Sequence, residues 1–153
     1  MFKLFNLEKF KSNYAFIYNG KKIRFSKVLS DIKRYNKRIK KNSIIFVLSE
    51  NTYSSILSYL ISISGDNIVL LLDAQYDKNY IDKMIKEYCP NYIFFNSKKK
   101  SFNGKMVFEL EETVLVELSN ISNKNINFKN FLLLTTSGTT SNPKVVRLSR
   151  ENI

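Results

Sequence analysis

The sequence contains no histidine, and this absence excludes several catalytic designs from the chain. Ser-His-Asp and Cys-His nucleophilic sites, acid–base catalysis by imidazole and His-ligated metal sites all need the missing side chain. Only one cysteine is present, Cys89, so no disulfide can form within the chain. It directly precedes Pro90 at the end of a helical pattern, and we predict that it is a buried small hydrophobic residue. A reducing compartment is compatible with this cysteine usage.

Long hydrophobic runs are also missing. The amino-terminal residues MFKLFNLEKFK alternate charged and apolar side chains, which is not the pattern of a secretory signal. The longest uncharged stretch, Asn51–Gly65, is rich in serine and shorter than the roughly 20 residues that a membrane-spanning helix needs. We therefore expect a soluble, cytoplasmic protein without a transmembrane segment.

Acidic residues are few compared with basic ones. The chain has 25 Lys and Arg against 13 Asp and Glu, and its formal net charge is +12. Such an excess can mark a nucleic-acid or anionic-membrane partner. The basic residues are spread over Lys21–Lys22, Lys33–Lys41 and Lys98–Lys100, however, and we interpret them as solvated surface rather than as a nucleic-acid site. The positive field still favours any phosphate ligand.

What is present is enough apolar material for a core. Hydrophobic residues make up 44% and aromatic residues 14% of the 153 positions, which is too much for a disordered chain. The length suits one ordinary domain. Neither an internal repeat nor a domain boundary is visible along the sequence.

The first part of the chain predicts a small β-hairpin followed by an amphipathic helix. Tyr14–Tyr18 and Lys22–Phe25 flank Asn19–Gly20, a dipeptide suited to the positive φ angles of a tight turn. Ser26 is the predicted N-cap of the helix. Its apolar stripe repeats every three or four residues and consists of Val28, Ile32, Tyr35 and Ile39.

The middle of the chain predicts alternating strands and helices. Three apolar runs have the composition of strands covered on both faces: Ser43–Leu48, Asn67–Leu72 and Tyr92–Phe95. Between them we predict a buried helix, Tyr53–Ser62, which ends at Gly65 in a left-handed cap, and a second helix from an N-cap at Asp77 to Cys89-Pro90. Strands and helices alternating over short connections indicate right-handed βαβ units, a parallel sheet and an α/β fold.

The pattern after these units is less regular. Ser97–Lys105 is typical of a basic polar loop, and Met106–Phe108 of one more short strand. Asn120–Asn130, dominated by Asn, Lys and Ser, indicates a surface connection. No secondary structure is assigned to Glu109–Ser119.

Chemically distinctive residues are concentrated near the carboxyl end. An apolar strand, Phe131–Leu134, runs into TTSGTTSNPK, residues 135–144, whose O–H and N–H donors can all turn toward one anion. Lys144 adds a positive charge. A polyphosphate suits this set, because each charge-assisted hydrogen bond contributes on the order of 1.5–3 kcal/mol. The segment is not a Walker loop, since Pro143 and Val145 flank the lysine where that motif needs Gly and Ser or Thr. From composition alone, a hairpin turn without a ligand is an equal alternative.

The order of these residues resembles a known signature. Thr136–Thr140, then Pro143-Lys144, then Ser149 and Asn152-Ile153 are similar to the phosphate-loop motif T-S-G-T-T-G-x-P-K-G, a strand and S-H-x-N. This motif belongs to the adenylate-forming superfamily, which comprises acyl-CoA synthetases, nonribosomal-peptide adenylation domains and luciferases. The resemblance identifies the chain as similar to the amino-terminal portion of these enzymes.

Three residues depart from the family pattern. Ser141 replaces the second Gly of the loop, Val145 replaces the Gly after the lysine, and Arg150 stands where the family usually has His. The first two restrict the backbone and crowd the phosphate, so they bear on how well ATP would bind. Ile44–Asn51 and Val69–Ala74 resemble upstream segments of the family more weakly.

The resemblance implies a fold with mostly parallel βαβ layers, a small amino-terminal β-hairpin and a final β-hairpin that carries the phosphate loop. Residues 1–153 are expected to be an incomplete part of the large amino-terminal domain, with no complete second domain. The implied activity is activation of a carboxylic acid as an acyl-adenylate, with ATP and Mg²⁺, after which CoA or a carrier-protein thiol takes the acyl group. The residues implied to hold the nucleotide phosphates are Thr136, Ser137, Gly138, Thr139, Thr140 and Lys144.

The family's segments for adenine, ribose and the catalytic lysine do not occur in the sequence. No catalytic residue and no protein metal ligand is therefore predicted within the chain, and we expect it to be inactive by itself, as a fragment or truncated gene product of low solubility. The alternative is a non-catalytic, truncated or degenerate paralogue that binds an anion or a partner protein.

Overall fold

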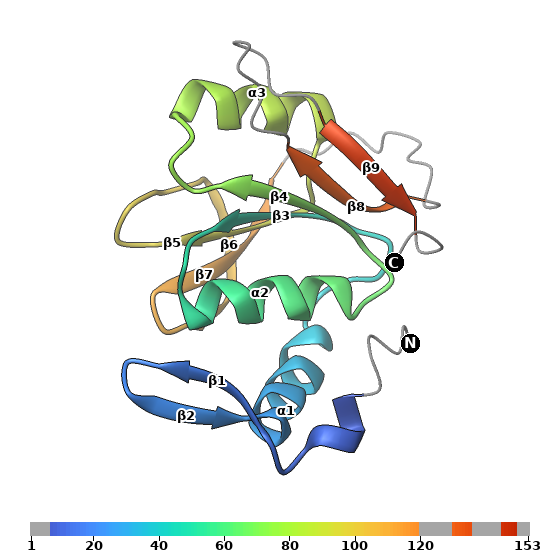
Figure 1. The fold of residues 1–153 in the computed structure, drawn as a ribbon. Coiled ribbons are helices and arrows are strands. Elements are labelled where there is room, and N and C mark those ends of the chain that lie inside the picture. Colours follow the sequence, from blue (N-terminus) through green and yellow to red (C-terminus); the bar gives the residue numbers. More distant parts are fainter. Residues whose placement is uncertain (1–6, 120–129, 136–144, 150–153) are drawn as a thin grey trace.

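The computed structural model describes residues 7–119, 130–135 and 145–149 (Figure 1). Within them the chain forms an α/β fold, with a two-stranded hairpin and a seven-stranded mixed sheet covered by helices on both faces. The predicted fold class is confirmed. In chain order the elements are the 3₁₀ helix η1 (Leu7–Phe10), β1 (Tyr14–Tyr18), β2 (Lys21–Arg24), α1 (Phe25–Asn36), β3 (Ile44–Ser49), α2 (Tyr53–Ile63), β4 (Ile68–Asp73), α3 (Lys78–Tyr88), β5 (Tyr92–Asn96), β6 (Gly104–Leu110), β7 (Thr113–Leu118), β8 (Asn130–Thr135) and β9 (Val145–Ser149).

The amino-terminal hairpin forms as predicted. Strands β1 and β2 pair antiparallel, and the turn residues Asn19 and Gly20 have φ angles of 48° and 73°. Left-handed angles at both positions suit a tight turn of the type I′ class, which favours Asn-Gly. The prediction for the next helix start is wrong: α1 begins at Phe25, and the residue at its capping position, Arg24, makes no side-chain cap bond. Ser26 therefore lies inside the first turn and is not the N-cap.

The large sheet has the strand order β6-β7-β5-β3-β4-β8-β9. Its four central strands, β5, β3, β4 and β8, run parallel. The alternation of strands and helices predicted this for β3, β4 and β5. Strands β6, β7 and β9 pair antiparallel at the two sides. Parallel strands covered on both faces have no water-facing side, which explains why their sequences are continuous apolar runs.

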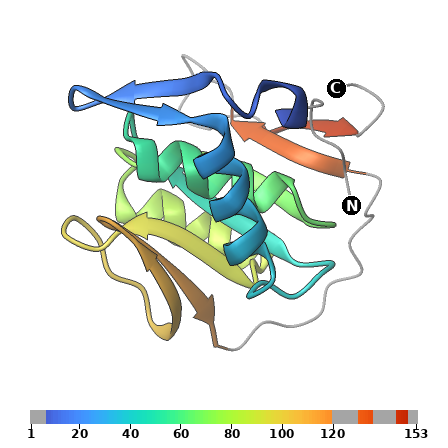
Figure 2. The ribbon, with the colours of Figure 1, turned by 90° about the horizontal axis from the view of Figure 1, so that it is seen from below.

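Each face of the sheet has its own hydrophobic core. Ile45 and Val47 of β3 point to the face covered by α1 and α2, whereas Ile44, Phe46 and Leu48 point to the face covered by α3. Figure 1 shows α2 and α3 on opposite sides of the sheet, and Figure 2 shows α1 against α2 on the same side. Adjacent strands β3 and β4 are thus followed by helices on opposite faces.

The end of α2 and the burial of Cys89 differ from the prediction, whereas α3 has the predicted N-cap at Asp77 and ends at Cys89 as predicted. Helix α2 is capped by Ser64 in the right-handed conformation, and Gly65 does not have a positive φ. A Cβ atom at Gly65 would lie 2.4 Å from Nδ2 of Asn67 and 3.3 Å from Oδ1 of Asn36, so any larger residue there would have to displace the Asn67 side chain. Helix α3 ends in a left-handed cap at Cys89, with φ 47°, and this cysteine is half-buried rather than buried.

Strands β6 and β7 form a hairpin that accounts for most of Glu109–Ser119, the segment without a predicted structure. The turn places Glu111 at φ 54°, an angle that is uncommon for glutamate and that the sequence therefore does not predict. Strand β6 also begins at Gly104, before the predicted start at Met106. The predicted surface connection Asn120–Asn130 lies outside the described residues, except for residue 130, which starts β8.

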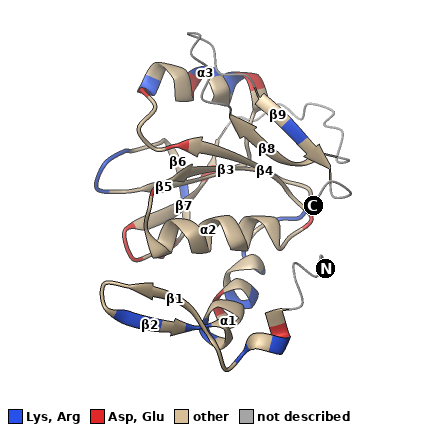
Figure 3. Cartoon of the chain, viewed as in Figure 1, with Lys and Arg blue, Asp and Glu red and all other residues tan. Residues whose placement is uncertain are grey.

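Charged residues are dispersed over helices, strands, turns and loops of the described chain (Figure 3). No helix in the described ranges combines the length and the apolar character that crossing a membrane requires.

Candidate functional site

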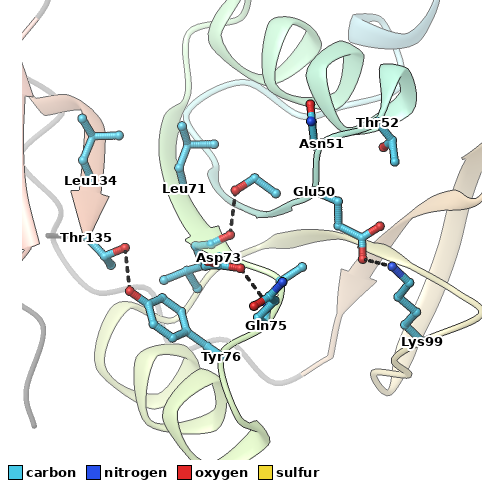
Figure 4. Close-up of a pocket in the computed structure, with 13 residues that line it drawn as sticks. Glu50, Asn51, Thr52, Leu71, Asp73, Gln75, Tyr76, Lys99, Leu134 and Thr135 are labelled. Carbon is cyan, nitrogen blue, oxygen red and sulfur yellow. Dashed lines mark hydrogen bonds and ion pairs between the residues drawn. The ribbon is translucent and has the colours of Figure 1, made fainter. Parts of the chain in front are cut away.

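A cleft of about 950 Å³ lies at the carboxyl ends of β3, β4 and β8 (Figure 4). It is lined by Ser49–Thr52, Leu71–Tyr76, Leu134-Thr135 and Lys99. The topology explains its position: the segments that leave β3 and β4 diverge toward α2 on one face and α3 on the other, which opens a crevice between two adjacent strand ends. In open α/β sheets ligands bind at such a point.

One wall is the turn from β3 into α2. Thr52 is the N-cap of α2, and its Oγ1 accepts a hydrogen bond of 3.2 Å from the amide of Ser55. The amide of Glu50 donates to Oγ of the same Ser55 at 2.9 Å, and the amide of Thr52 donates to the carbonyl of Glu50 at 2.9 Å. These bonds fix the backbone between the strand and the helix, so the side chains of this wall project from a defined turn.

The opposite wall is the turn from β4 into α3. Oδ1 of Asp73 accepts a hydrogen bond of 2.8 Å from the amide of Gln75. The two walls are joined at their base, because the amide of Ala74 donates to the carbonyl of Ser49 at 3.1 Å and Oγ of Ser49 donates to the carbonyl of Leu72 at 3.0 Å. The Asp73 side chain itself is exposed in the cleft.

A third side of the cleft is the end of β8. The phenol oxygen of Tyr76 lies 3.5 Å from Oγ1 of Thr135, a contact that links the turn after β4 to the last residue of β8 (Figure 4). Thr135 is also the register partner of Val145 in β9. Strand β8 thus ends at the cleft with Thr135, and β9 begins beside it with Val145.

A cation enters the cleft from the loop after β5. Nζ of Lys99 lies 3.0 Å from Oε1 of Glu50, whose side chain is only 15% exposed. Oε2 of the same glutamate accepts a hydrogen bond of 3.1 Å from Nδ2 of Asn96, the last residue of β5. Glu50 thus holds Lys99 at the cleft, with Asn96 bound to its second oxygen.

The residues predicted for phosphate binding do not belong to the described part of the chain. Thr136, Ser137, Gly138, Thr139, Thr140 and Lys144 lie outside the described residues, as do Ser141 and Arg150. The structure describes the two residues that flank the segment, Thr135 and Val145, and the first of them lines the cleft.

The sequence interpretation missed four residues of the cleft walls: Glu50, Asp73, Tyr76 and Lys99. Three of them follow the carboxyl end of a predicted parallel strand within a few residues, and that position is the signal that could have found them. Lys99 belongs to the basic residues that the sequence analysis interprets as solvated surface. Within the described ranges, no group of three or more His, Cys, Asp or Glu residues lies together in a way that could hold a metal ion.

No protein-family model matches the sequence, and no curated protein matches it. Solved structures do resemble the fold. The amino-terminal subdomain of NpsA from Klebsiella oxytoca aligns with a TM-score of 0.64 and 14% identity, over 94% of this chain and 40% of that one. The o-succinylbenzoate CoA synthetase MenE from Bacillus subtilis, in complex with its acyl-adenylate intermediate, aligns with a TM-score of 0.63 and 16% identity, over 94% and 42%.

Apo MatB from Rhodopseudomonas palustris aligns with a TM-score of 0.63 and 14% identity, over 91% of this chain and 32% of that one. The chain spans less than half the length of each of these three structures. The strand order, the crevice between β3 and β4 and these alignments agree with one another: the chain has the fold of the amino-terminal portion of adenylate-forming enzymes, as the phosphate-loop motif predicted.

Proposed function

We propose that the chain binds the phosphates of ATP at this cleft and forms the front part of an ATP-dependent ligase that activates a carboxylic acid as an acyl-adenylate. The observation that carries the proposal is the position of Thr135, which lines the cleft and is directly followed by the phosphate-loop motif Thr136–Thr140. Val145, the first residue of β9, is the register partner of Thr135, so the two described residues that flank the segment 136–144 lie next to each other. A phosphate loop in this position would face the crevice where α/β folds bind their ligands.

In the proposed reaction a carboxylate oxygen forms a bond to the α-phosphorus of ATP. The bond between that phosphorus and the oxygen bridging to the β-phosphate breaks, and its electron pair leaves with pyrophosphate. Donors aimed at the leaving group stabilise the negative charge that grows on it. The proposed donors are Thr136, Ser137, Gly138, Thr139, Thr140 and Lys144. A thiol of CoA or of a carrier protein would take the acyl group in a second step.

The described residues of the cleft walls would position the start of the loop and assist the bound ATP. The contact between Tyr76 and Thr135 would orient the residue from which the loop starts. Magnesium binds through substrate phosphates and one or two carboxylates rather than through a dedicated protein cage, so an ion delivered with ATP needs little from the chain. Asp73, the exposed carboxylate of the cleft, fits that need.

Calorimetric titration of the folded chain with ATP and Mg²⁺ tests the proposal. Lys144→Ala removes one charge-assisted hydrogen bond and should weaken binding roughly tenfold or more. Gly138→Val should weaken it as well, by crowding the loop. Lys86→Ala is the matched control, because it removes the same charge from an exposed position of α3 that does not line the cleft.

Absence of ATP binding to the folded wild-type chain, or equal affinity of the wild type and Lys144→Ala, would contradict the proposal. Either result would favour the alternative, a degenerate paralogue whose serine- and threonine-rich segment is only a turn.

A further inference from the structure

A second hollow, of about 480 Å³, lies between the start of α3 and the loop that follows β5. We call it the basic hollow, because four lysines line it: Lys78, Lys98, Lys99 and Lys100. Figure 3 shows the start of α3 and the loop after β5 as basic segments on the same side of the molecule. Lys99 also lines the cleft, so the two hollows are neighbours.

The loop that carries three of the lysines is ordered by one buried side chain, Asn96, which is 7% exposed. Its Oδ1 accepts a hydrogen bond of 3.0 Å from the amide of Lys98. Its carbonyl oxygen accepts from the amides of Lys99 at 3.1 Å and Lys100 at 3.0 Å. Nδ2 of the same residue donates to Glu50 at 3.1 Å. The backbone that carries the three consecutive lysines is therefore fixed by short-range bonds to Asn96.

Two of the four positive charges are not neutralised by described carboxylates. Nζ of Lys98 lies 2.7 Å from Oε1 of Glu112, and Lys99 pairs with Glu50. Nζ of Lys100 instead donates to the backbone carbonyl of Tyr76 at 3.1 Å. Lys78 forms no ion pair with a carboxylate in the described part of the chain.

Lys78 lies at the amino-terminal end of α3. It is the first residue of α3, and the first turn of this helix contains no acidic residue. The preceding Asp77 already uses its carboxylate to cap the helix, accepting a hydrogen bond of 2.9 Å from the amide of Tyr80. An anion bound near Lys78 would also lie at the positive end of the α3 dipole, which favours negative charge.

We propose that the basic hollow binds a phosphate group other than those held by the loop of residues 136–144. Lys78 and Lys100 would supply the charges that are not already paired. The side of the hollow formed by the Phe102 ring is apolar. This ring is held in place by packing against Phe95, with ring centroids 4.9 Å apart. A phosphate ester with a small apolar group fits this combination.

The proposal that the basic hollow binds an anion does not depend on the proposed function. The role given to that anion does rest on the proposed function. Because Lys99 borders both hollows, a phosphate here would lie beside the reacting nucleotide. It would belong either to a second, phosphorylated substrate or to pyrophosphate that has left the cleft.

Calorimetry with two probes, phenyl phosphate and inorganic pyrophosphate, tests the proposal on the full chain at low salt. The double variant Lys78→Ala/Lys100→Ala should weaken binding of at least one probe on the order of tenfold, because two charged donors are lost. Lys33→Ala/Lys86→Ala is the matched control, since it removes the same charge from exposed positions outside the basic hollow and should change binding little. The single variant Lys78→Ala leaves the Asn96 network intact and covers the case in which the double variant does not fold.

The proposal is overturned if neither probe binds the wild type, if the lysine variants bind as the wild type does, or if the control loses as much affinity as the double variant. Tighter binding of phenyl phosphate would identify a phosphorylated substrate, and tighter binding of pyrophosphate would identify the product. Lys144→Ala separates the two sites. Loss of ATP binding with retained binding of phenyl phosphate would support both proposals. If instead Lys78→Ala/Lys100→Ala binds the probes as the wild type does, the basic hollow is refuted and the proposed function stays intact.

Discussion

Removal of the Tyr53 hydroxyl should stabilise the protein. Tyr53 starts α2, is 8% exposed and packs against Phe16 and Tyr18, with ring centroids 5.8 Å and 6.4 Å away. Its hydroxyl is buried and has no hydrogen-bond partner among the described residues. Tyr53→Phe keeps the ring contacts and removes only this unpaired group.

The expected gain follows from the cost of burying a polar group without a partner, which is about 1–3 kcal/mol. For a chain of this size each kcal/mol raises the melting temperature by roughly 2–4 °C. Tyr53→Phe should therefore be more stable than the wild type by at least about 1 kcal/mol at neutral pH.

The same hydroxyl adds a pH dependence. Burial, followed by the charges of Asp31 and Glu111, raises the pKa of Tyr53 from 10.0 to about 12. Because the folded state holds this proton more tightly than the unfolded state, ionisation adds no cost below about pH 10, and the free energy of unfolding falls as the pH rises from about 10 toward 12. This part of the alkaline destabilisation should disappear in Tyr53→Phe.

Urea unfolding at pH 7 and across the alkaline range measures both effects. Tyr76→Phe is the control, because its hydroxyl contacts Thr135 and its removal should not stabilise the fold. A Tyr53→Phe protein less stable than the wild type at pH 7 would refute the reasoning, since it would mean that the hydroxyl makes a favourable bond.

Three further changes test other features of the fold. Thr52→Ala should lower the free energy of unfolding by about 1 kcal/mol, because the cap bond of α2 is lost. Ser26→Ala should change the urea midpoint little, because Ser26 is not the N-cap of α1. Equal effects of the two substitutions would contradict the observed caps. Phe94→Ala should lower the free energy of unfolding by roughly 3–5 kcal/mol, since the ring is fully buried. A decrease below about 1 kcal/mol would mean that the Phe94 ring is not packed in the core. The hydrogen bond and charge of Lys98 lower the pKa of Glu112 from 4.5, so this exposed pair stabilises above that pH and the effect is lost as the pH falls. An NMR titration of Glu112 in Lys98→Ala should return its pKa toward the ordinary value, and an unchanged titration would contradict the pairing.

Much of the sheet could be predicted because parallel strands leave a simple signal. Ile44–Ser49 is buried on both faces, so nearly every residue is apolar and no turn residue interrupts it. The hairpin of β6 and β7 could not be predicted in the same way. Its turn carries Glu111 at a positive φ where Gly or Asn would have marked it, so tertiary pairing decides the conformation.

Glycine and cysteine at helix ends show why residue type alone misleads. Gly65 is predicted to supply a left-handed cap, but its role is to leave room for the side chain of Asn67, which lies close to it. Cys89, predicted to be buried, supplies the left-handed cap of α3. Both positions follow a helix, and only the surrounding packing separates the two roles.

The candidate site divides into a part carried by one segment and a part assembled by the fold. The phosphate-loop motif is contiguous, so the sequence predicts it, and it stays a prediction because its residues lie outside the described ranges. The cleft walls come from positions far apart in sequence, as in the pairing of Glu50 with Lys99. No local pattern announces such a pair; it follows only from the strand order.

The central claim is that ATP binds at the carboxyl ends of β3, β4 and β8, and the most direct test is to locate ATP on the folded chain. Titration of ATP and Mg²⁺ into ¹⁵N-labelled protein, followed by NMR, reports which backbone amides respond. The account predicts that the largest shifts occur at Ser49–Thr52, Asp73–Tyr76 and Thr135. Shifts confined to other surfaces, or none at ATP concentrations that saturate calorimetric binding, would contradict it.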